Sequence, residues 1–304
     1  MRAENEALFA LEPSHSTSLG GPMNGELSGG VQLPEKGPGY LGNPKRRAEA
    51  RYGTVELVQA LVRAAATSDP GDDSPPLVIN DLSLADGGPI RQHGSHQSGR
   101  DVDILFFVRD LQGNPRRSVG VPIAPDGRGV DFQDLSTPDD DVGVLIDTER
   151  TWRFIAALLE EGGDDVQRIF IVEHLRTMLL AEAQRQNAPK ALQERFAMIS
   201  CQPGSPHDDH MHVRFHCSTD DLSAGCRDTP PVYPFRKRQL AHAGRNPQLV
   251  GRISAGSRKA AATRTTTPQQ ARAAAGPMHA DVVAFLDARN AWLKKTTPPR
   301  PYCK

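Results

Sequence analysis

Long apolar runs are absent from this chain of 304 residues. No stretch approaches the roughly twenty consecutive apolar residues that a membrane-spanning helix needs, so we expect no transmembrane segment. Hydrophobic residues make up 38% of the chain, charged residues make up 24%, and the formal net charge is -1. This balance also excludes a wholly disordered chain, and it predicts a protein with a buried core plus poorly ordered additions.

The first thirty residues lack the marks of a secretory signal, which are a basic start, an apolar stretch and a small-residue cleavage site. Their most apolar part, ALFALEP, is short and follows two acidic residues. The sequence therefore leaves three possibilities open: a signal that is missing from this start, export by another route, or a protein that stays inside the cell.

Two further absences limit the chemistry. The string G-x-S-x-G does not occur, and the four cysteines look structural, so neither a serine nor a cysteine nucleophile is supported. Aromatic residues make up only 5% of the chain, and none is interleaved with the basic residues near the C-terminus. We therefore expect no surface that stacks nucleic-acid bases, and no nucleic-acid partner.

Histidines and carboxylates, by contrast, gather in two segments more than a hundred residues apart. HGSHQSGRDVDILFF begins at His93, and HDDHMHVRFHC begins at His207. Successive side chains of a strand point to opposite faces. In the second segment, the alternate residues from His210 to His216 are all basic and those between them are apolar. We expect a strand with one apolar face and one face of nitrogen donors.

The first segment has a similar pattern. Asp101 and Asp103 alternate with Val102 and Ile104, and the chain then becomes continuously apolar. We expect a strand that enters the core after presenting two carboxylates on one side. Both segments would therefore place metal-ligand atoms on the surface of a sheet.

Two histidines and one carboxylate can supply the three protein ligands of catalytic zinc, which keeps a fourth position open for water. We predict one Zn2+ per chain, bound by His96, Asp103 and His212. Calcium or magnesium would not call for this many imidazoles, and an iron site of this kind would need a cosubstrate pocket that the sequence does not reveal. A single H-x-H pattern is a weak indication alone, because paired histidines also occur as solvated strand residues.

The surrounding strings resemble the penicillin-insensitive murein endopeptidase family, within the wider group of lysostaphin-type peptidases, D-Ala-D-Ala metallopeptidases and hedgehog domains. The H-x6-D pattern of that group is matched from His96, and its H-x-H pattern from His210. The longer signatures of the family resemble SHQSGRDVDI and HDDHMHVR. The resemblance covers residues from about Ser18 to Cys226.

The resemblance implies a periplasmic or secreted zinc peptidase that hydrolyses the D-alanyl to meso-diaminopimelyl cross-link of peptidoglycan. It also implies that His210, on the same strand face as His212, accepts a proton from the attacking water. We expect His207 to stabilise the oxyanion or to donate to the leaving amine, or else to support the site from behind. Asp101 would orient a ligand histidine, and His93 is a weaker candidate.

The motifs define a metal site and not a peptide pocket. A D,D-carboxypeptidase or an amidase acting on peptidoglycan is therefore an alternative. A non-catalytic zinc-containing binding module is another, although such a module would not need to keep His210.

Two cysteines, Cys217 and Cys226, bracket a short polar loop directly after the second segment. This spacing is compatible with a disulfide, and the family has cysteines at similar positions. Cys201 and Cys303 have no assigned partner, and Glu26 stands where the family has a further cysteine.

The order of the remaining elements predicts an α+β domain. Its mainly antiparallel central sheet would carry the zinc site, with flanking helices and a poorly ordered basic C-terminal extension. Helices are predicted over residues 54–66, 148–161 (with Thr148 as the N-cap) and 173–187, strands over 77–82 and 166–172, and a long loop or hairpin over 121–141.

We divide the chain into a flexible N-terminus (1–17), a zinc metallopeptidase domain (18–234), a basic low-complexity linker (235–278) and a short helix with a tail (279–304). Residues 236–277 contain nine Lys or Arg and no acid, and too few large apolar residues to fold alone. This segment is either a solvated linker or an electrostatic contact with an anionic cell-envelope polymer.

Overall fold

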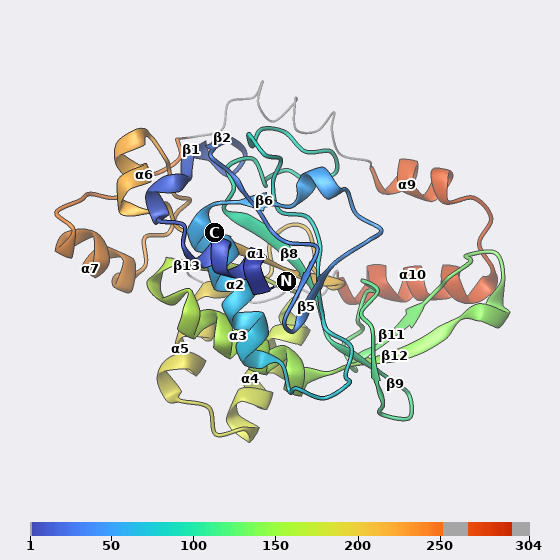
Figure 1. The fold of residues 1–304 in the computed structure, drawn as a ribbon. Coiled ribbons are helices and arrows are strands. Elements are labelled where there is room, and N and C mark those ends of the chain that lie inside the picture. Colours follow the sequence, from blue (N-terminus) through green and yellow to red (C-terminus); the bar gives the residue numbers. More distant parts are fainter. Residues whose placement is uncertain (1, 252–266, 294–304) are drawn as a thin grey trace.

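The computed structural model describes residues 2–251 and 267–293 (Figure 1). Its helices are α1 (Arg2–Phe9), α2 (Val55–Ser68), α3 (Thr148–Glu161), α4 (Glu173–Arg185), α5 (Lys190–Ile199), α6 (Thr219–Ala224), α7 (Pro234–His242), α9 (Pro268–Ala275) and α10 (Ala280–Leu293). Its strands are β1 (Thr17–Gly21), β2 (Asn24–Ser28), β3 (Val31–Gln32), β4 (Lys36–Gly37), β5 (Tyr40–Gly42), β6 (Tyr52–Gly53), β7 (Leu77–Ile79), β8 (Asp101–Leu105), β9 (Val108–Asp110), β10 (Pro115–Arg116), β11 (Arg128–Asp131), β12 (Val142–Ile146), β13 (Val166–Phe170), β14 (Ser200–Cys201) and β15 (His210–Phe215).

A seven-stranded sheet in the order β14-β13-β15-β8-β7-β5-β4 forms the centre of the molecule. The pairs β13–β14 and β5–β7 are parallel, and the other four neighbouring pairs are antiparallel. A second sheet, in the order β10-β9-β12-β11, lies at the periphery. Helices flank the central sheet (Figure 1). The predicted α+β class with a mainly antiparallel sheet is confirmed.

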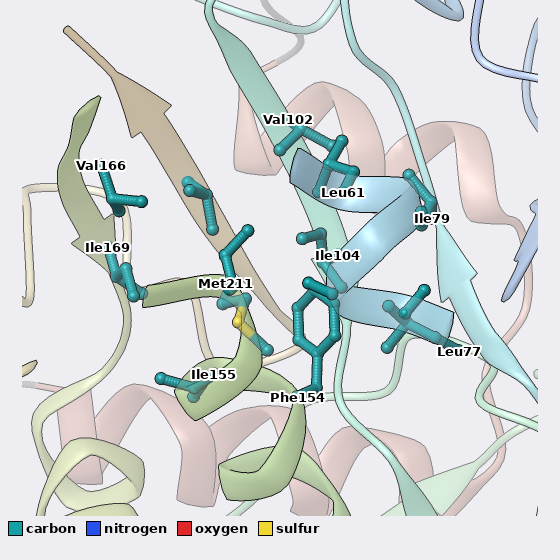
Figure 2. Close-up of a cluster of buried hydrophobic side chains, with 14 of the residues drawn as sticks. Leu61, Leu77, Ile79, Val102, Ile104, Phe154, Ile155, Val166, Ile169 and Met211 are labelled. Atoms are coloured by element: carbon teal, nitrogen blue, oxygen red, sulfur yellow. The ribbon is translucent and has the colours of Figure 1, made fainter. Parts of the chain in front are cut away.

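The hydrophobic core fixes which face of the two central strands is polar. Val102 and Ile104 of β8 and Met211 of β15 are fully buried with Leu61 of α2 and Phe154 of α3 (Figure 2). Burying each such side chain contributes about 1.5–3 kcal/mol. A slip of one residue would turn this apolar set away from the core, so the packing holds the polar residues between them on the opposite face.

Local sequence signals account for the two helices that cover this core. The side-chain oxygen of Thr54 accepts a hydrogen bond from the Leu57 N–H at 3.4 Å and caps α2. The predicted N-cap of α3 was wrong by one residue. Asp147 caps the helix by accepting from the Arg150 N–H at 3.1 Å, and Thr148 already belongs to the first turn. Asp147 is held in place because Arg109 also donates to its carboxylate.

The predicted loop cysteines form a disulfide. Cys217 and Cys226 are bonded, with their Cα atoms 5.9 Å apart, and the bond closes the loop that contains α6. This confirms the pairing inferred from the sequence.

In the described part of the predicted basic linker (235–278), the structure shows helical residues of α7 and α9. α7 packs on the preceding domain, because Phe235 and Leu240 are buried and Arg236 donates to the Cys217 carbonyl at 2.7 Å. α9 follows at residue 268. The middle of the predicted linker (252–266) and the last part of the predicted tail (294–304) lie outside the described residues. Among the residues that the structure does describe, no helix is both long and apolar enough to cross a membrane.

Candidate active site

The two polar segments meet side by side in the central sheet. β8 and β15 are antiparallel neighbours, with His212 directly opposite Asp103 and Arg214 directly opposite Asp101. Residues opposite each other on one face have Cβ atoms about 4.5–5.5 Å apart. The register therefore pairs each carboxylate of β8 with a basic side chain of β15.

The three predicted zinc ligands converge. His212 Nδ1 lies 3.0 Å from Asp103 Oδ1, and His96 Nε2 lies 3.3 Å from the same oxygen. The two nitrogens are 3.2 Å apart. All three residues are at most 5% exposed. The structure thus brings ligand atoms from a loop and two strands into one buried cluster.

In His96 and His212, the ring nitrogen that faces away from Asp103 forms a hydrogen bond, and this bond defines the tautomer of the ring. His96 Nδ1 donates to the Leu82 carbonyl at 2.7 Å, and His212 Nε2 donates to Asp101 Oδ1 at 2.8 Å. In the neutral rings, His96 Nε2 and His212 Nδ1 therefore carry lone pairs that face Asp103. Metal-binding histidines are commonly oriented in this way, by a carbonyl or carboxylate on the far nitrogen.

The oxygen at the centre of the cluster also fits a cation. Asp103 Oδ1 is buried and receives no hydrogen bond of normal geometry from the described residues. An unsatisfied buried oxygen facing two nitrogen lone pairs is unfavourable unless a positive charge lies between them. The donor set of two imidazoles and one carboxylate is therefore suited to a metal ion.

The surroundings of both carboxylates of β8 lower their pKa values and favour the ionised form. Burial alone would raise the pKa of Asp101, but Arg214 and His212 more than offset this effect and hold the pKa well below its usual range. Burial opposes ionisation of Asp103 in the same way, and His96 and His210 overcome it, so its pKa also lies well below the usual range. Asp101 additionally accepts a hydrogen bond from the His96 backbone N–H at 3.2 Å, and so it contacts both histidines that are predicted as ligands.

His93 is a further metal-capable residue at this site. One ring nitrogen of His93 lies within 4.8 Å of a ring nitrogen of His96 and of a carboxylate oxygen of Asp103. His93 Nδ1 is 3.5 Å from Asp103 Oδ2, while His93 Nε2 is 2.8 Å from Asp81. His93 was only a weaker candidate in the sequence analysis, and Asp81, which follows the strand β7 and anchors the histidine ring, was not predicted.

His210 lies next to the predicted ligands, as its position on β15 requires. Asp209 Oδ1 is 2.6 Å from His210 Nδ1, and His210 Nε2 is 3.5 Å from Asp103 Oδ1. Burial lowers the pKa of His210, but Asp103 and Asp209 outweigh it and raise the pKa to about 9. The ring is thus anchored at one nitrogen and presents the other to the ligand cluster.

His207 differs from His210 in its charge. Burial, together with the nearby His212 and His210, lowers the pKa of His207 to about 3. Its Nδ1 donates to the Ser205 carbonyl at 2.9 Å, so in the neutral ring Nε2 is a hydrogen-bond acceptor. The His207 ring centre lies 5.0 Å from that of His210. The two histidines therefore occupy one site, but their surroundings shift their pKa values in opposite directions.

Two of these histidines have left-handed backbone conformations. φ is 66° at His96 and 52° at His207. Such conformations cost about 1–3 kcal/mol each for a residue with a side chain, and they concentrate at functional sites. The strain indicates that the positions of these rings are imposed by the surrounding structure.

The cluster opens into a cleft of about 780 Å³. Besides the histidines, Arg46, Phe170 and Arg289 line it. Arg289 comes from α10 and binds the buried Asp208 through two hydrogen bonds of 2.7 Å. Sequence reasoning missed Arg289, because α10 lies far along the chain and no local pattern marks a residue that reaches another segment.

Comparison with known proteins identifies the family. Residues 18–272 match the family model described as penicillin-insensitive murein endopeptidase. The match begins at Ser18, where the sequence resemblance also begins, and it extends beyond Cys226, where that resemblance ends. A protein of that name from Haemophilus influenzae is 26% identical over 225 residues, which are 73% of this chain and 70% of the relative. One from Citrobacter koseri is 28% identical over 227 residues, 72% of each. The matched region contains every predicted site residue, and the chain belongs to the penicillin-insensitive murein endopeptidase family.

Proposed function

We propose that this protein is a zinc-dependent peptidoglycan endopeptidase that hydrolyses the D-alanyl to meso-diaminopimelyl cross-link. Family membership supports a peptidase, and the names of the relatives support murein as the polymer. The observation that carries the proposal is the convergence of His96 Nε2, Asp103 Oδ1 and His212 Nδ1 within 3.3 Å of one another.

One zinc ion would be held at this site by His96, Asp103 and His212. Imidazole nitrogen with a single carboxylate suits zinc better than calcium or magnesium, which prefer oxygen ligands. When bound, zinc lowers the pKa of a water molecule to about 7 and polarises a carbonyl group.

His212 is a better third ligand than His93. Its Nδ1 lies 3.0 Å from Asp103 and 3.2 Å from His96 Nε2, with a lone pair directed toward both. His93 approaches Asp103 only to 3.5 Å and is anchored to Asp81. We propose that His93 lines the rim of the site.

His210 is the proposed proton acceptor. Asp209 holds its Nδ1, so Nε2 faces the space beside Asp103 where a water molecule must lie. A cation at Asp103 would neutralise one of the two carboxylates that raise the pKa of His210. The pKa would then fall from about 9 toward neutrality, which is where a general base works best.

His207 is proposed to act on the opposite side of the scissile bond. Its Nδ1 is occupied by the Ser205 carbonyl, so Nε2 is the atom available to the substrate. Because the ring is neutral, Nε2 must first take up a proton before it can donate one to the oxyanion or to the leaving amine. Its proximity to His210 offers a route for that proton.

The proposed substrate also has implications for location and binding. Murein lies outside the cytoplasmic membrane, so we propose a periplasmic or secreted protein. Peptide stems of murein carry carboxylates, and Arg46 in the cleft wall, with 41% of its side chain exposed, offers a cation to such a group.

The test is digestion of cross-linked murein by the purified protein, with and without a chelator, followed by identification of the released muropeptides. We expect dimers to become monomers that keep their terminal D-alanine, and the chelator to stop the reaction. Loss of terminal D-alanine with the dimers intact would instead indicate a D,D-carboxypeptidase, and release of whole peptides from the glycan would indicate an amidase. If the protein binds zinc at the site but releases no product, the proposed enzymatic activity is rejected, and the non-catalytic binding module becomes the better interpretation.

A further inference from the structure

A second group of metal-ligand side chains lies outside the active-site cleft. Asp141, His279 and Asp281 each offer one ligand atom, and these atoms all lie within 4.8 Å of one another. Asp141 directly precedes β12, while His279 and Asp281 flank the first residue of α10. The group therefore joins the β11–β12 hairpin to α10, which lie beside each other in Figure 1.

Two atoms of this group are buried without a normal hydrogen bond. His279 Nε2 and Asp141 Oδ1 have no hydrogen-bond partner among the described residues. The His279 side chain is 9% exposed, and its Nε2 lies 3.3 Å from Asp141 Oδ2. Leaving a buried polar atom unsatisfied costs about 1–3 kcal/mol. Their arrangement is therefore incomplete without a proton or a metal ion between them.

The His279 ring is held in place by contacts that do not involve Nε2. The backbone N–H of His279 donates to the Leu135 carbonyl at 2.8 Å and fixes the position of the residue. The ring also packs edge-on against Phe132, with centroids 5.8 Å apart, and Phe132 packs in turn against Phe285 of α10. These contacts leave Nε2 directed toward Asp141, and a preorganised ligand loses little entropy when it binds an ion.

The surrounding charge favours a cation. Asp139 and Asp140 directly precede Asp141, and the negative charges of Asp140 and Asp141 help to raise the pKa of Asp131, for which burial is the larger cause. An ion pair between protonated His279 and Asp141 would neutralise only one of these carboxylates. A divalent ion would neutralise two and would also engage Asp281.

We propose that Asp141, His279 and Asp281 bind a second divalent metal ion of the class that accepts imidazole, with zinc as the best candidate. The remaining coordination positions are filled by water, because Asp281 is exposed. The ion fastens α10 to the β11–β12 hairpin. This site raises the predicted zinc content from one ion per chain to two.

The proposed ion supports the active site through α10. Arg289 lies eight residues after Asp281, about 12 Å farther along the helix. It neutralises Asp208, which is fully buried in the chain between His207 and His210. α10 begins after residue 272, where the family match ends. The site is thus built partly from a segment that lies outside the matched region.

Zinc content of the full-length protein after equilibration with limiting free zinc tests the proposal. Wild-type protein is expected to hold two ions, whereas His279→Ala and Asp281→Asn each hold one. Because Asp281 is exposed, Asp281→Asn keeps the test valid if His279→Ala fails to fold. The dissociation constant of the second ion should rise at least about tenfold in either variant.

Matched controls separate this site from the active site. His242→Ala and Asp287→Asn change an exposed histidine and an exposed α10 carboxylate outside the group, and both should keep two ions. Asp103→Ala should lose only the active-site ion. Unchanged zinc content in both His279→Ala and Asp281→Asn would overturn the second site, whatever happens in Asp103→Ala.

Discussion

Two buried aspartates lie near opposite ends of β15, and their surroundings differ. Near the end of β15, Asp228 lies 3.1 Å from His216 and accepts hydrogen bonds from the guanidinium groups of Arg100 and Arg236. Near the start of β15, the ion pairs of Asp103 with the described residues are all with imidazoles. Both carboxylates therefore face a histidine, but only Asp228 has permanent positive charges beside it.

This difference explains why one cluster is suited to a metal ion and the other to structural support. Guanidinium groups stay protonated and have no lone pair to offer, so Arg100 and Arg236 balance the charge of Asp228 without a metal ion. In their neutral forms, His96 and His212 direct lone pairs toward the Asp103 oxygen, and none of the ion pairs of Asp103 among the described residues involves a permanently charged group. The alternating histidines in the sequence did not distinguish a cluster suited to a metal ion from one suited to structural support. The residues that contact Asp103 and Asp228 do distinguish them.

The largest expected effect is that of Asp103→Ala. Removing the carboxylate should release the active-site zinc and remove several kcal/mol of transition-state stabilisation, which is about a thousandfold or more in rate. Zinc content and muropeptide dimer cleavage measure the two effects. Asp86→Ala, an exposed aspartate, is the control. An Asp103→Ala protein that retained its activity would refute the assignment of Asp103 as a ligand.

His210→Ala should separate catalysis from metal binding. We expect zinc to be retained and the rate to fall about 10²–10⁴-fold, because a positioned general base contributes that much. His242→Ala, which alters an exposed histidine, should change neither quantity. Simultaneous loss of zinc would mean that His210 is a ligand and not the base.

Asp228→Ala should affect stability and not zinc. Arg100 and Arg236 are each 1% exposed, so removing their partner leaves buried charges and should cost about 3–5 kcal/mol in the free energy of unfolding. Denaturant unfolding at neutral pH measures this loss. Zinc lost from a folded Asp228→Ala protein would break the distinction between the two clusters.

The lowered pKa of Asp228 also predicts how the free energy of unfolding changes at low pH. Burial opposes ionisation of Asp228, but His216, Arg100 and Arg236 hold its pKa well below the usual range. A lowered native pKa stabilises the fold fully above the unfolded pKa of about 4, and the stabilisation is lost as pH falls toward the native value. The difference in unfolding free energy between wild type and Asp228→Ala should therefore shrink below about pH 4. A difference that grows with acid would contradict this account.

The smallest expected effect is that of Asp101→Asn. The amide can still accept a hydrogen bond from His212 Nε2 but lacks the charge that pairs with Arg214. Supporting carboxylates of this kind typically contribute 10–100-fold to metal affinity, so the zinc dissociation constant should rise by about that factor. Zinc competition titration measures the change. An unaltered constant would show that Asp101 does not tune the site.

Strand alternation was sufficient to predict the faces of the two central strands. Met211 and Val213 lie in the core, and His212 lies on the opposite face, because the period of a strand is fixed by its backbone. The sequence could not show that β8 and β15 are neighbours with His212 opposite Asp103. Register between distant strands depends on the packing of the whole sheet and on the turns that join it.

Parts of the site that depend on long-range contacts were also missed. Arg289 reaches Asp208 across 81 residues, and α7 packs on the loop that contains Cys217 although its sequence reads as a basic linker. Helix ends are similarly sensitive to context, since Asp147 was chosen as the cap of α3 over the adjacent Thr148. In each case a tertiary partner decides the outcome, and local propensity does not reveal it.

Anomalous X-ray diffraction at the zinc edge, from crystals grown near neutral pH with zinc, tests the central claim most directly. We expect an anomalous peak about 2.0–2.2 Å from His96 Nε2, an Asp103 oxygen and His212 Nδ1, and no peak beside Asp228. A peak coordinated by His93 in place of His212, or by Asp228, would contradict it.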